Sequence, residues 1–331
     1  MQYLTIDFGG TLVKYSVMDE NCKVFERKEE KSPVESRELF LDFICRLYEE
    51  YKSDYEIGGI AVSMPGIIDG RNGLIQSAGA FLSLYGMNLC EELKDRLPVP
   101  FTVENDGKCG ALAEVWQGNL KEQDDGIVLL LGTGVAGGII KDRQIHRGKN
   151  LSAGEFSYIL MGEEPGFYGT ALYKCSVSAL LFEACRRKGI DVRKSTNYEL
   201  LSHFLVCSQE LSEMNDLPEY AQGMNGYQFF ELLEQGDADI RELYEDFTKN
   251  LARLILNLQL IYAPEKVLVG GGISRQPRLI SDIRRQYDAL EKTFLGVFPV
   301  PCKIDTCRFG NEANQYGALY HFLRQHVIRE G

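Results

Sequence analysis

Apolar positions along this chain follow two patterns: short runs typical of buried strands, and longer stretches with helical spacing. The short runs fall at residues 2–6, 12–17, 60–63, 100–103, 127–131 and 266–269. The longest helical pattern covers 240–261, where an apolar side chain recurs every three or four residues until Pro264 ends the helix. Strands that alternate with such helices predict an α/β protein.

Two of the strands end in glycine-rich corners of similar design. Residues 7–11 read DFGGT after the first strand, and residues 132–138 read GTGVAGG after the strand at 127–131. A further strand follows each corner, which indicates that the two halves of the chain are divergent copies of one unit. Glycines let backbone N–H groups point toward a phosphate, and a threonine hydroxyl adds a donor, so we predict phosphate binding at both corners. A pair of ordinary hairpin turns is the alternative.

Three carboxylates follow strands or glycines and are candidates for chemistry. Asp7 beside the first corner could hold Mg²⁺, through water, or simply end a strand in hydrogen bonds. Asp106 precedes a helix predicted over 108–116, where it could cap the helix or act as a general base. Glu155, in Ala153-Gly154-Glu155, could accept hydrogen bonds from sugar hydroxyls or lie exposed in a loop.

The triple glycine at 270–272 ends the strand at 266–269. It could let the backbone approach a nucleotide closely, or it could form a tight turn from strand to helix. The sequence contains neither the GxxxxGK[ST] motif nor a GxGxxG in a βαβ setting, which excludes a P-loop and a Rossmann site.

Charge and composition restrict the partners. The 331 residues carry a formal net charge of −12, which argues against broad binding to nucleic acid or to an anionic membrane. No apolar run reaches the roughly 20 residues needed to span a bilayer, and the first residues do not resemble a secretion signal, so we expect a cytoplasmic protein. Nine cysteines without a CxxC pair predict reduced, mostly buried thiols.

Six segments, taken in order, resemble the ROK family of sugar kinases and repressors. They are DFGGT at 7–11, MPGIIDG at 64–70, ENDGKCGALAE at 104–114, LGTGVAGGII at 131–140, AGE at 153–155 and VGGGIS at 269–274. The resemblance covers nearly the whole chain. It implies an actin-like, ribonuclease-H-like ATPase fold of two lobes with a central cleft, and phosphorylation of a hexose by ATP and Mg²⁺.

The resemblance also implies roles for individual residues. Asp106 is expected to be the catalytic base. The residues expected at the sugar are Asn105, Glu155, Tyr158, Gly79, Ala80 and Gly66. The residues expected at ATP and its Mg²⁺ are Asp7, Gly9, Gly10, Thr11, Lys14, Gly132, Thr133, Gly134, Gly270, Gly271 and Gly272.

The family likeness further suggests the organisation of the chain. It places residues 1–117 in a small N-terminal lobe, 118–307 in a large lobe, and a C-terminal helix within 308–331 back on the first lobe. The polar stretch at about 191–226 is expected to be a helical or loop insertion. A homodimer is expected from the likeness alone.

One departure concerns zinc. Most ROK members have a histidine three residues after the AGE glutamate and then a CxCGxxGC motif, whereas this chain has Tyr158 and only Cys175 nearby. We therefore expect no structural zinc. AGEFSY and the segments at 77–89 and 317–323 look like the zinc-less branch typified by bacterial β-glucoside kinases, and loss of the histidine could make room for an aglycone.

The sequence thus predicts an ATP-dependent sugar kinase that phosphorylates the 6-hydroxyl of a hexose or β-glucoside, with β-glucoside kinase leading. Glucokinase and N-acetylmannosamine kinase are the alternatives within the family. A non-catalytic sugar sensor is a more distant alternative. A repressor would carry a DNA-binding module before the first strand, and because that strand begins at residue 2 or 3 we do not expect a repressor.

Overall fold

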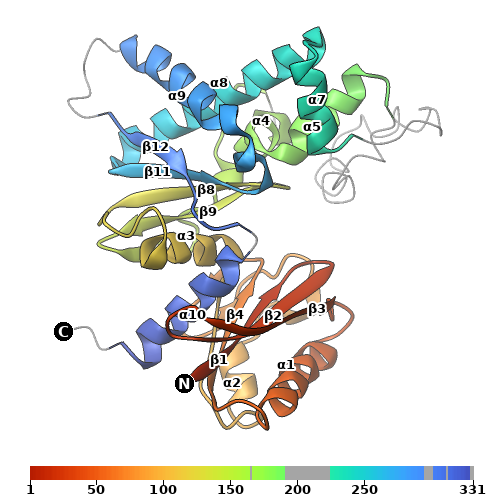
Figure 1. The fold of residues 1–331 in the computed structure, drawn as a ribbon, viewed down its shortest axis with the longest axis vertical. Coiled ribbons are helices and arrows are strands. Elements are labelled where there is room, and N and C mark those ends of the chain that lie inside the picture. The colour runs from red at the N-terminus through yellow and green to blue at the C-terminus, as the bar shows by residue number, and fades with distance from the viewer. Residues whose placement is uncertain (165, 191–223, 294–300, 311, 329–331) are drawn as a thin grey trace. The chain divides into compact units, whose positions relative to one another are not determined.

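The computed structural model describes residues 1–164, 166–190, 224–293, 301–310 and 312–328, which form an α/β protein as the sequence predicts (Figure 1). The strands are β1 Gln2–Phe8, β2 Leu12–Asp19, β3 Val24–Lys31, β4 Ile57–Met64, β5 Ile68–Asp69, β6 Leu74–Ile75, β7 Phe101–Asn105, β8 Gly126–Leu131, β9 Val135–Lys141, β10 Gln144–His146, β11 Lys266–Gly270 and β12 Lys303–Thr306. The α-helices are α1 Arg37–Tyr51, α2 Leu89–Leu93, α3 Asp106–Gln117, α4 Ala171–Cys175, α5 Val177–Arg187, α7 Gly226–Glu234, α8 Ala238–Tyr262, α9 Pro277–Lys292 and α10 Ala313–His326.

The two large sheets have the same strand order. The first runs β3-β2-β1-β4-β7, with β1 antiparallel to β2 and parallel to β4, and β4 parallel to β7. The second runs β10-β9-β8-β11-β12, with β9 and β10 antiparallel and β11 and β12 parallel. In each sheet three strands consecutive in sequence are followed by two that join after a helical segment. The shared order confirms that the two halves of the chain repeat one unit.

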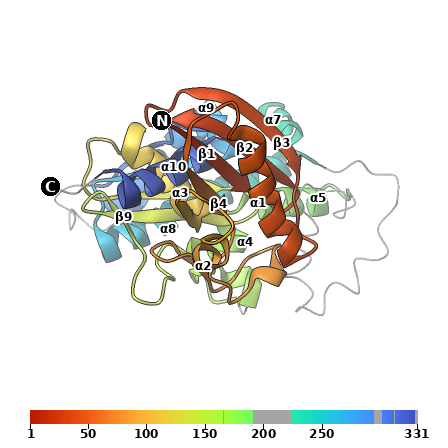
Figure 2. The ribbon, with the colours of Figure 1, turned by 90° about the horizontal axis from the view of Figure 1, so that it is seen from below.

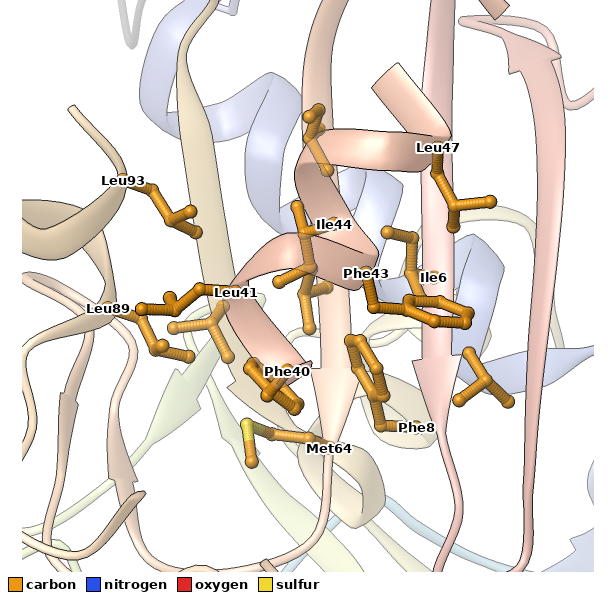
Figure 3. Packing of buried hydrophobic residues seen from close by; sticks show 14 of the residues in the cluster. Ile6, Phe8, Phe40, Leu41, Phe43, Ile44, Leu47, Met64, Leu89 and Leu93 are labelled. Carbon is orange, nitrogen blue, oxygen red and sulfur yellow. The ribbon is translucent and has the colours of Figure 1, made fainter. Parts of the chain in front are cut away.

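The first sheet buries both of its faces. Toward α1 and α2 it presents residues such as Ile6 and Phe8 of β1, which pack against Phe40 and Phe43 of α1 (Figure 3). The rings of Phe8 and Phe40 lie 4.4 Å apart between centroids, and a buried apolar cluster of this size supplies most of the stabilisation of such a layer. Ser36 begins α1 by accepting a hydrogen bond from the Leu39 amide at 3.2 Å.

The opposite face of the first sheet is covered by α3 and α10. Tyr3 of β1 packs against Phe322 of α10 in a second buried cluster. Both Figure 1 and Figure 2 show α10 alongside α3. Helix α10 therefore packs on the first sheet, on the same face as α3.

The long helix α8 spans Ala238–Tyr262, close to the predicted 240–261. Asp237 caps its N-terminus, and Ala263 ends it in the left-handed conformation immediately before Pro264. The helix packs against α4, α5 and α9, and α9 contacts β12. The predicted alternation of strands with helices thus holds in this half of the chain too.

The chain divides into two compact units. One comprises Met1–Val128, Gly137–Gly154 and Arg308–Gly331, and the other comprises Leu129–Ala136 and Glu155–Cys307. The lobe boundaries predicted near residues 117 and 308 stay a prediction. The insertion expected at about 191–226 lies, up to residue 223, outside the described residues. None of the described helices combines the length and the apolar character needed to cross a membrane.

Candidate active site

Asp106 lies at the first position of α3, where β7 ends. Its Oδ1 accepts hydrogen bonds from the side-chain amide of Asn105 at 3.0 Å and from the Gly107 amide at 2.7 Å. The cap of α3 is Asn105, whose Oδ1 accepts from the Lys108 amide at 3.0 Å, so the sequence-based alternative of Asp106 as the helix cap is wrong. Asp106 bonds the amide of the next residue, whereas the Asn105 side chain reaches the amide three residues ahead, which is the geometry of a helix cap.

The electrostatics of Asp106 suit proton transfer. Burial raises the pKa of its carboxyl above the usual range, and hydrogen bonding by the Gly107 amide and the positive charge of Lys108 counteract part of that rise. A general base works best when its pKa approaches the operating pH, so a raised pKa is the shift that this role needs.

Asn105 connects Asp106 to the segment after β4. Its side-chain nitrogen also donates to the Gly66 carbonyl at 2.9 Å. Gly66 has φ of 118°, and a Cβ there would overlap the Ser77 carbonyl, so only glycine fits. Gly79 stands against Pro65, and Ala80 against Gly10. The structure therefore brings the predicted sugar residues Asn105, Gly66, Gly79 and Ala80 together with Asp106 and the first glycine corner.

The first corner is a tight turn whose carbonyls are already bonded. The Gly9 amide donates to Leu12 at 3.0 Å, and Ser32 donates to the carbonyls of Gly9 and Thr11. Within the described part of the chain no acceptor pairs with the amides of Gly10 or Thr11. Both residues are exposed, so these amides are suitable donors to a phosphate.

Asp7 is the second-last residue of β1, beside this corner. Its Oδ1 accepts from the Ser63 hydroxyl at 2.8 Å and from the Asn314 side-chain amide at 3.1 Å. Lys14 lies opposite it in the β1–β2 pair. Burial raises the pKa of Asp7 to about 6, and the negative charge of Asp106 adds to the rise, while Ser63, Asn314 and Lys14 lower it. Because both hydrogen bonds end on Oδ1, Oδ2 is the oxygen suited to a hard cation or its water shell.

Thermal unfolding should show this ionisation. An ordinary aspartate has a pKa of about 4, so between about pH 4 and 6 the folded protein binds more protons at Asp7 than the unfolded chain does. The unfolding free energy of the wild type therefore falls as pH rises through this window. The Asp7→Asn variant does not show this fall, because its side chain does not ionise, while its amide oxygen can still accept both hydrogen bonds. We expect Asp7→Asn to have the higher unfolding midpoint at pH 7.5, and the gap to close toward pH 4.5, in buffer without divalent metal.

The exposed Asp95→Asn variant serves as the control for this pH series. A midpoint difference between Asp7→Asn and the wild type that stays constant with pH would contradict the assignment.

Residues 132–136 of the second corner lie in the other compact unit. The Gly132 carbonyl accepts from the Val177 amide at 3.0 Å and from the Ser178 amide at 3.2 Å, which fixes the corner to the start of α5. Gly134 must be glycine, because a Cβ there would lie 2.8 Å from the Ser157 hydroxyl. Thr133 at the tip of the turn is half-buried.

The triple glycine serves packing at two of its three positions. Gly271 has φ of 90°, and a Cβ there would overlap the Leu131 carbonyl; a Cβ on Gly270 would lie 2.7 Å from the Cys307 sulfur. Gly272 begins the 3₁₀ helix Gly272–Arg275 and has open space around its Cα. The tight-turn interpretation thus explains Gly270 and Gly271, and Gly272 is the position that a nucleotide could approach.

Glu155 and Tyr158 bound the 3₁₀ helix Phe156–Tyr158 in the same unit as the second corner. The Tyr158 side chain is 63% exposed. Cys175 is a buried free thiol at the end of α4. Among the described residues no group of three or more His, Cys, Asp or Glu could hold a metal ion, and the expected lack of structural zinc stays a prediction.

Sequence reasoning missed four residues that surround the predicted base and the first corner. Ser63 and Asn314 hold Asp7, and Glu104 and Arg147 form an ion pair next to Asn105. Glu104 lies inside the ENDGKCGALAE segment, which could have drawn attention to it. Asn314 is 307 positions from Asp7, so no local pattern could connect the two.

Comparisons with known proteins agree with this architecture. The ROK family model matches residues 3–325. A β-glucoside kinase from Listeria monocytogenes is 27% identical over 328 residues, covering 98% of each chain. A β-glucoside kinase from Klebsiella pneumoniae is 28% identical over 322 residues, 97% of this chain and 96% of the relative.

Among solved structures, a ROK family glucokinase from Streptomyces griseus in complex with glucose and AMPPNP matches with a TM-score of 0.71 at 22% identity. The match covers 96% of this chain and 98% of that chain. This similarity confirms the predicted actin-like fold.

Proposed function

The chain belongs to the ROK family, and we propose that it is a sugar kinase that transfers the γ-phosphate of ATP to the 6-hydroxyl of a β-glucoside. One observation carries the proposal: the half-buried carboxylate of Asp106 is held by Asn105 and by the Gly107 amide next to the Gly66, Gly79 and Ala80 segments. Such a carboxylate can accept a proton from a bound hydroxyl.

In the proposed reaction Asp106 takes the proton of the sugar 6-hydroxyl as its oxygen bonds to the γ-phosphorus. The bond between that phosphorus and the bridging oxygen breaks, and ADP leaves with the electron pair. Positioning and electrostatics carry most of the catalysis in phosphoryl transfer, so the orientation of the base matters as much as its pKa.

The donor side uses the glycine corners. The Gly10 and Thr11 amides would donate to phosphate oxygens, and those of Thr133 and Gly134 would do the same from the second corner, where the Gly132 amide closes the turn by donating to the Gly134 carbonyl. Gly272 would lie near the adenosine. Asp7, with Lys14 opposite it, fits a Mg²⁺ ion held through water, because Oδ2 is a hard oxygen donor beside the phosphate-binding amides. When bound, that ion would neutralise negative charge on the phosphates.

The acceptor preference rests on two supports. The curated relatives from Listeria and Klebsiella are named β-glucoside kinases. Tyr158, which replaces the family's histidine, is exposed rather than part of a metal cluster, and this is compatible with room for an aglycone. Glu155 would bind sugar hydroxyls. Residence in the cytoplasm and a homodimer remain predictions from the sequence.

Turnover of a sugar panel tests the proposal. We expect ADP release from ATP and Mg²⁺ to be faster with cellobiose and other β-glucosides than with glucose or N-acetylmannosamine, because the pocket would bind the aglycone as well as the glucosyl ring. The measurement is kcat/KM for each sugar in a coupled ADP assay. A higher kcat/KM for a free monosaccharide would support a sugar kinase but contradict the proposal that the pocket binds an aglycone. Lack of turnover with every sugar would favour the sensor.

A further inference from the structure

A buried ion pair joins the two chain segments that lead to the predicted acceptor-binding residues. The Glu104 side chain is fully buried in β7, two positions before Asp106, and it pairs with Arg147, whose side chain is 17% exposed. Buried ion pairs are weak contributors to net stability, because desolvation offsets much of their attraction. We therefore expect the Glu104–Arg147 pair to have a role other than stabilising the fold.

Each oxygen of the Glu104 carboxylate has its own partner. Oε1 accepts from the Asn105 backbone amide at 2.8 Å, and Oε2 accepts from Nε of Arg147 at 3.1 Å and from its Nη2. The two-nitrogen contact fixes the plane of the guanidinium, a geometry that a lysine cannot reproduce. Glu104 thus connects Arg147 to the residue that orients Asp106.

Arg147 in turn fixes the loop that leads to Glu155. The Ala153 amide donates to the Arg147 carbonyl at 3.3 Å, which closes the loop into a compact turn. Gly148, Leu151 and Gly154 all have positive φ, and Leu151 is buried under the turn. Glu155 follows Gly154 directly. The position of Arg147 therefore sets where the loop ends and where Glu155, the predicted sugar-binding residue, begins.

The residues around the Glu104–Arg147 pair leave space for the Glu104 carboxylate and for no additional side chain at position 70. A Cβ on Gly70 would overlap Oε2 of Glu104, so a side chain at that position would displace the carboxylate. The Gly70 carbonyl is itself held by Nε2 of His321 at 2.8 Å and by Nε2 of Gln325 at 2.6 Å, both from α10. Four segments of one compact unit therefore converge on the Glu104 carboxylate.

From this geometry we infer that Arg147 is a positioning residue for the sugar acceptor: through Glu104 it aligns the loop before Glu155 with the strand end that carries Asp106. This inference rests on the proposed function for the roles of Asp106 and Glu155. It assigns Arg147 to acceptor binding and not to nucleotide binding.

The test compares Arg147→Lys with Arg143→Lys in the full chain. Lysine keeps the charge but loses the two-nitrogen contact with Glu104. Arg143 is the matched control, since it is a nearby arginine that donates to the Lys121, Gln123 and Val115 carbonyls and not to Glu104. With cellobiose and ATP varied separately, we expect Arg147→Lys to raise KM for cellobiose about tenfold, the equivalent of one charge-assisted hydrogen bond. KM for ATP should stay unchanged in both variants.

A second measurement does not depend on turnover. Hydrogen–deuterium exchange should become faster in residues 148–155 of Arg147→Lys, and not in Arg143→Lys. Glu104→Gln should reproduce the cellobiose effect, and the double variant should add little to it, because the two residues act as one unit.

The inference is overturned if exchange at 148–155 matches the wild type in Arg147→Lys, or if the KM values for cellobiose and ATP rise together. A wild-type protein without sugar turnover would instead remove the proposed function, while the exchange data would still decide whether Arg147 positions the loop.

Discussion

The Asp106→Asn variant is expected to lose between about 10² and 10⁴ in kcat with the best sugar, the range that a general base contributes. The substitution removes the proton acceptor but little of the structure. The amide oxygen of asparagine can still accept from Asn105 and Gly107, and it avoids the burial of a charge that raises the pKa of Asp106. The unfolding midpoint at pH 7.5 should therefore equal or exceed that of the wild type.

Asp282→Asn is the matched control for this prediction. Asp282 is likewise a hydrogen-bonded aspartate shielded from solvent in part or whole, but it accepts from Tyr244 at 3.0 Å and from Arg278 at 2.9 Å in the other compact unit. Its substitution should lower the unfolding midpoint and leave kcat near the wild-type value. If Asp106→Asn kept kcat within about tenfold of the wild type, Asp106 would not be the base.

The Gly317→Ala variant is expected to destabilise the protein by roughly 3 kcal/mol, at the upper end of the usual cost of overpacking. Gly317 lies on α10 where that helix meets α3, and a Cβ there would overlap the backbone carbonyl of Cys109. Because the obstacle is backbone, the two helices would have to separate. Asn314 on the same helix would then move away from Asp7.

Urea unfolding of Gly317→Ala and Gly226→Ala separates overpacking from helix propensity. Gly226 also lies in a helix, at the start of α7, and an added Cβ would meet open space. Alanine there should be neutral or stabilising by up to about 1 kcal/mol. Equal unfolding free energies for the two variants would show that α3 and α10 do not meet as closely as the structure has them.

Turn chemistry explains where sequence and structure differ at the predicted base. The pattern of a strand followed by a helix made Asp106 the candidate cap, since aspartate fills that position well. The structure makes Asn105 the cap because its side chain also reaches the Gly66 carbonyl, a residue 39 positions away. The choice between neighbours was therefore made by a contact outside the local sequence.

The glycine motifs also show which features the local sequence predicts and which depend on tertiary contacts. The sequence located all three glycine-rich segments, and it predicted that they end strands. Only the packing of β11 against β8 shows that Gly270 and Gly271 are required by their own sheet, whereas Gly272 has open space. Composition alone cannot distinguish a glycine that admits a ligand from one that admits a neighbouring strand.

By itself the sequence determined strands β1, β2, β4, β7, β8 and β11, the long helix, the repeated corner and the identity of Asp7 and Asp106 as candidates, because periodicity and turn residues are local properties of the chain. The tertiary structure alone decided which side chains hold those carboxylates: Ser63 and Asn314 on Asp7, and Glu104 with Arg147 behind Asn105. These partners lie 43 to 307 positions apart in sequence, and they meet only because the packing of sheet and helices brings their segments together.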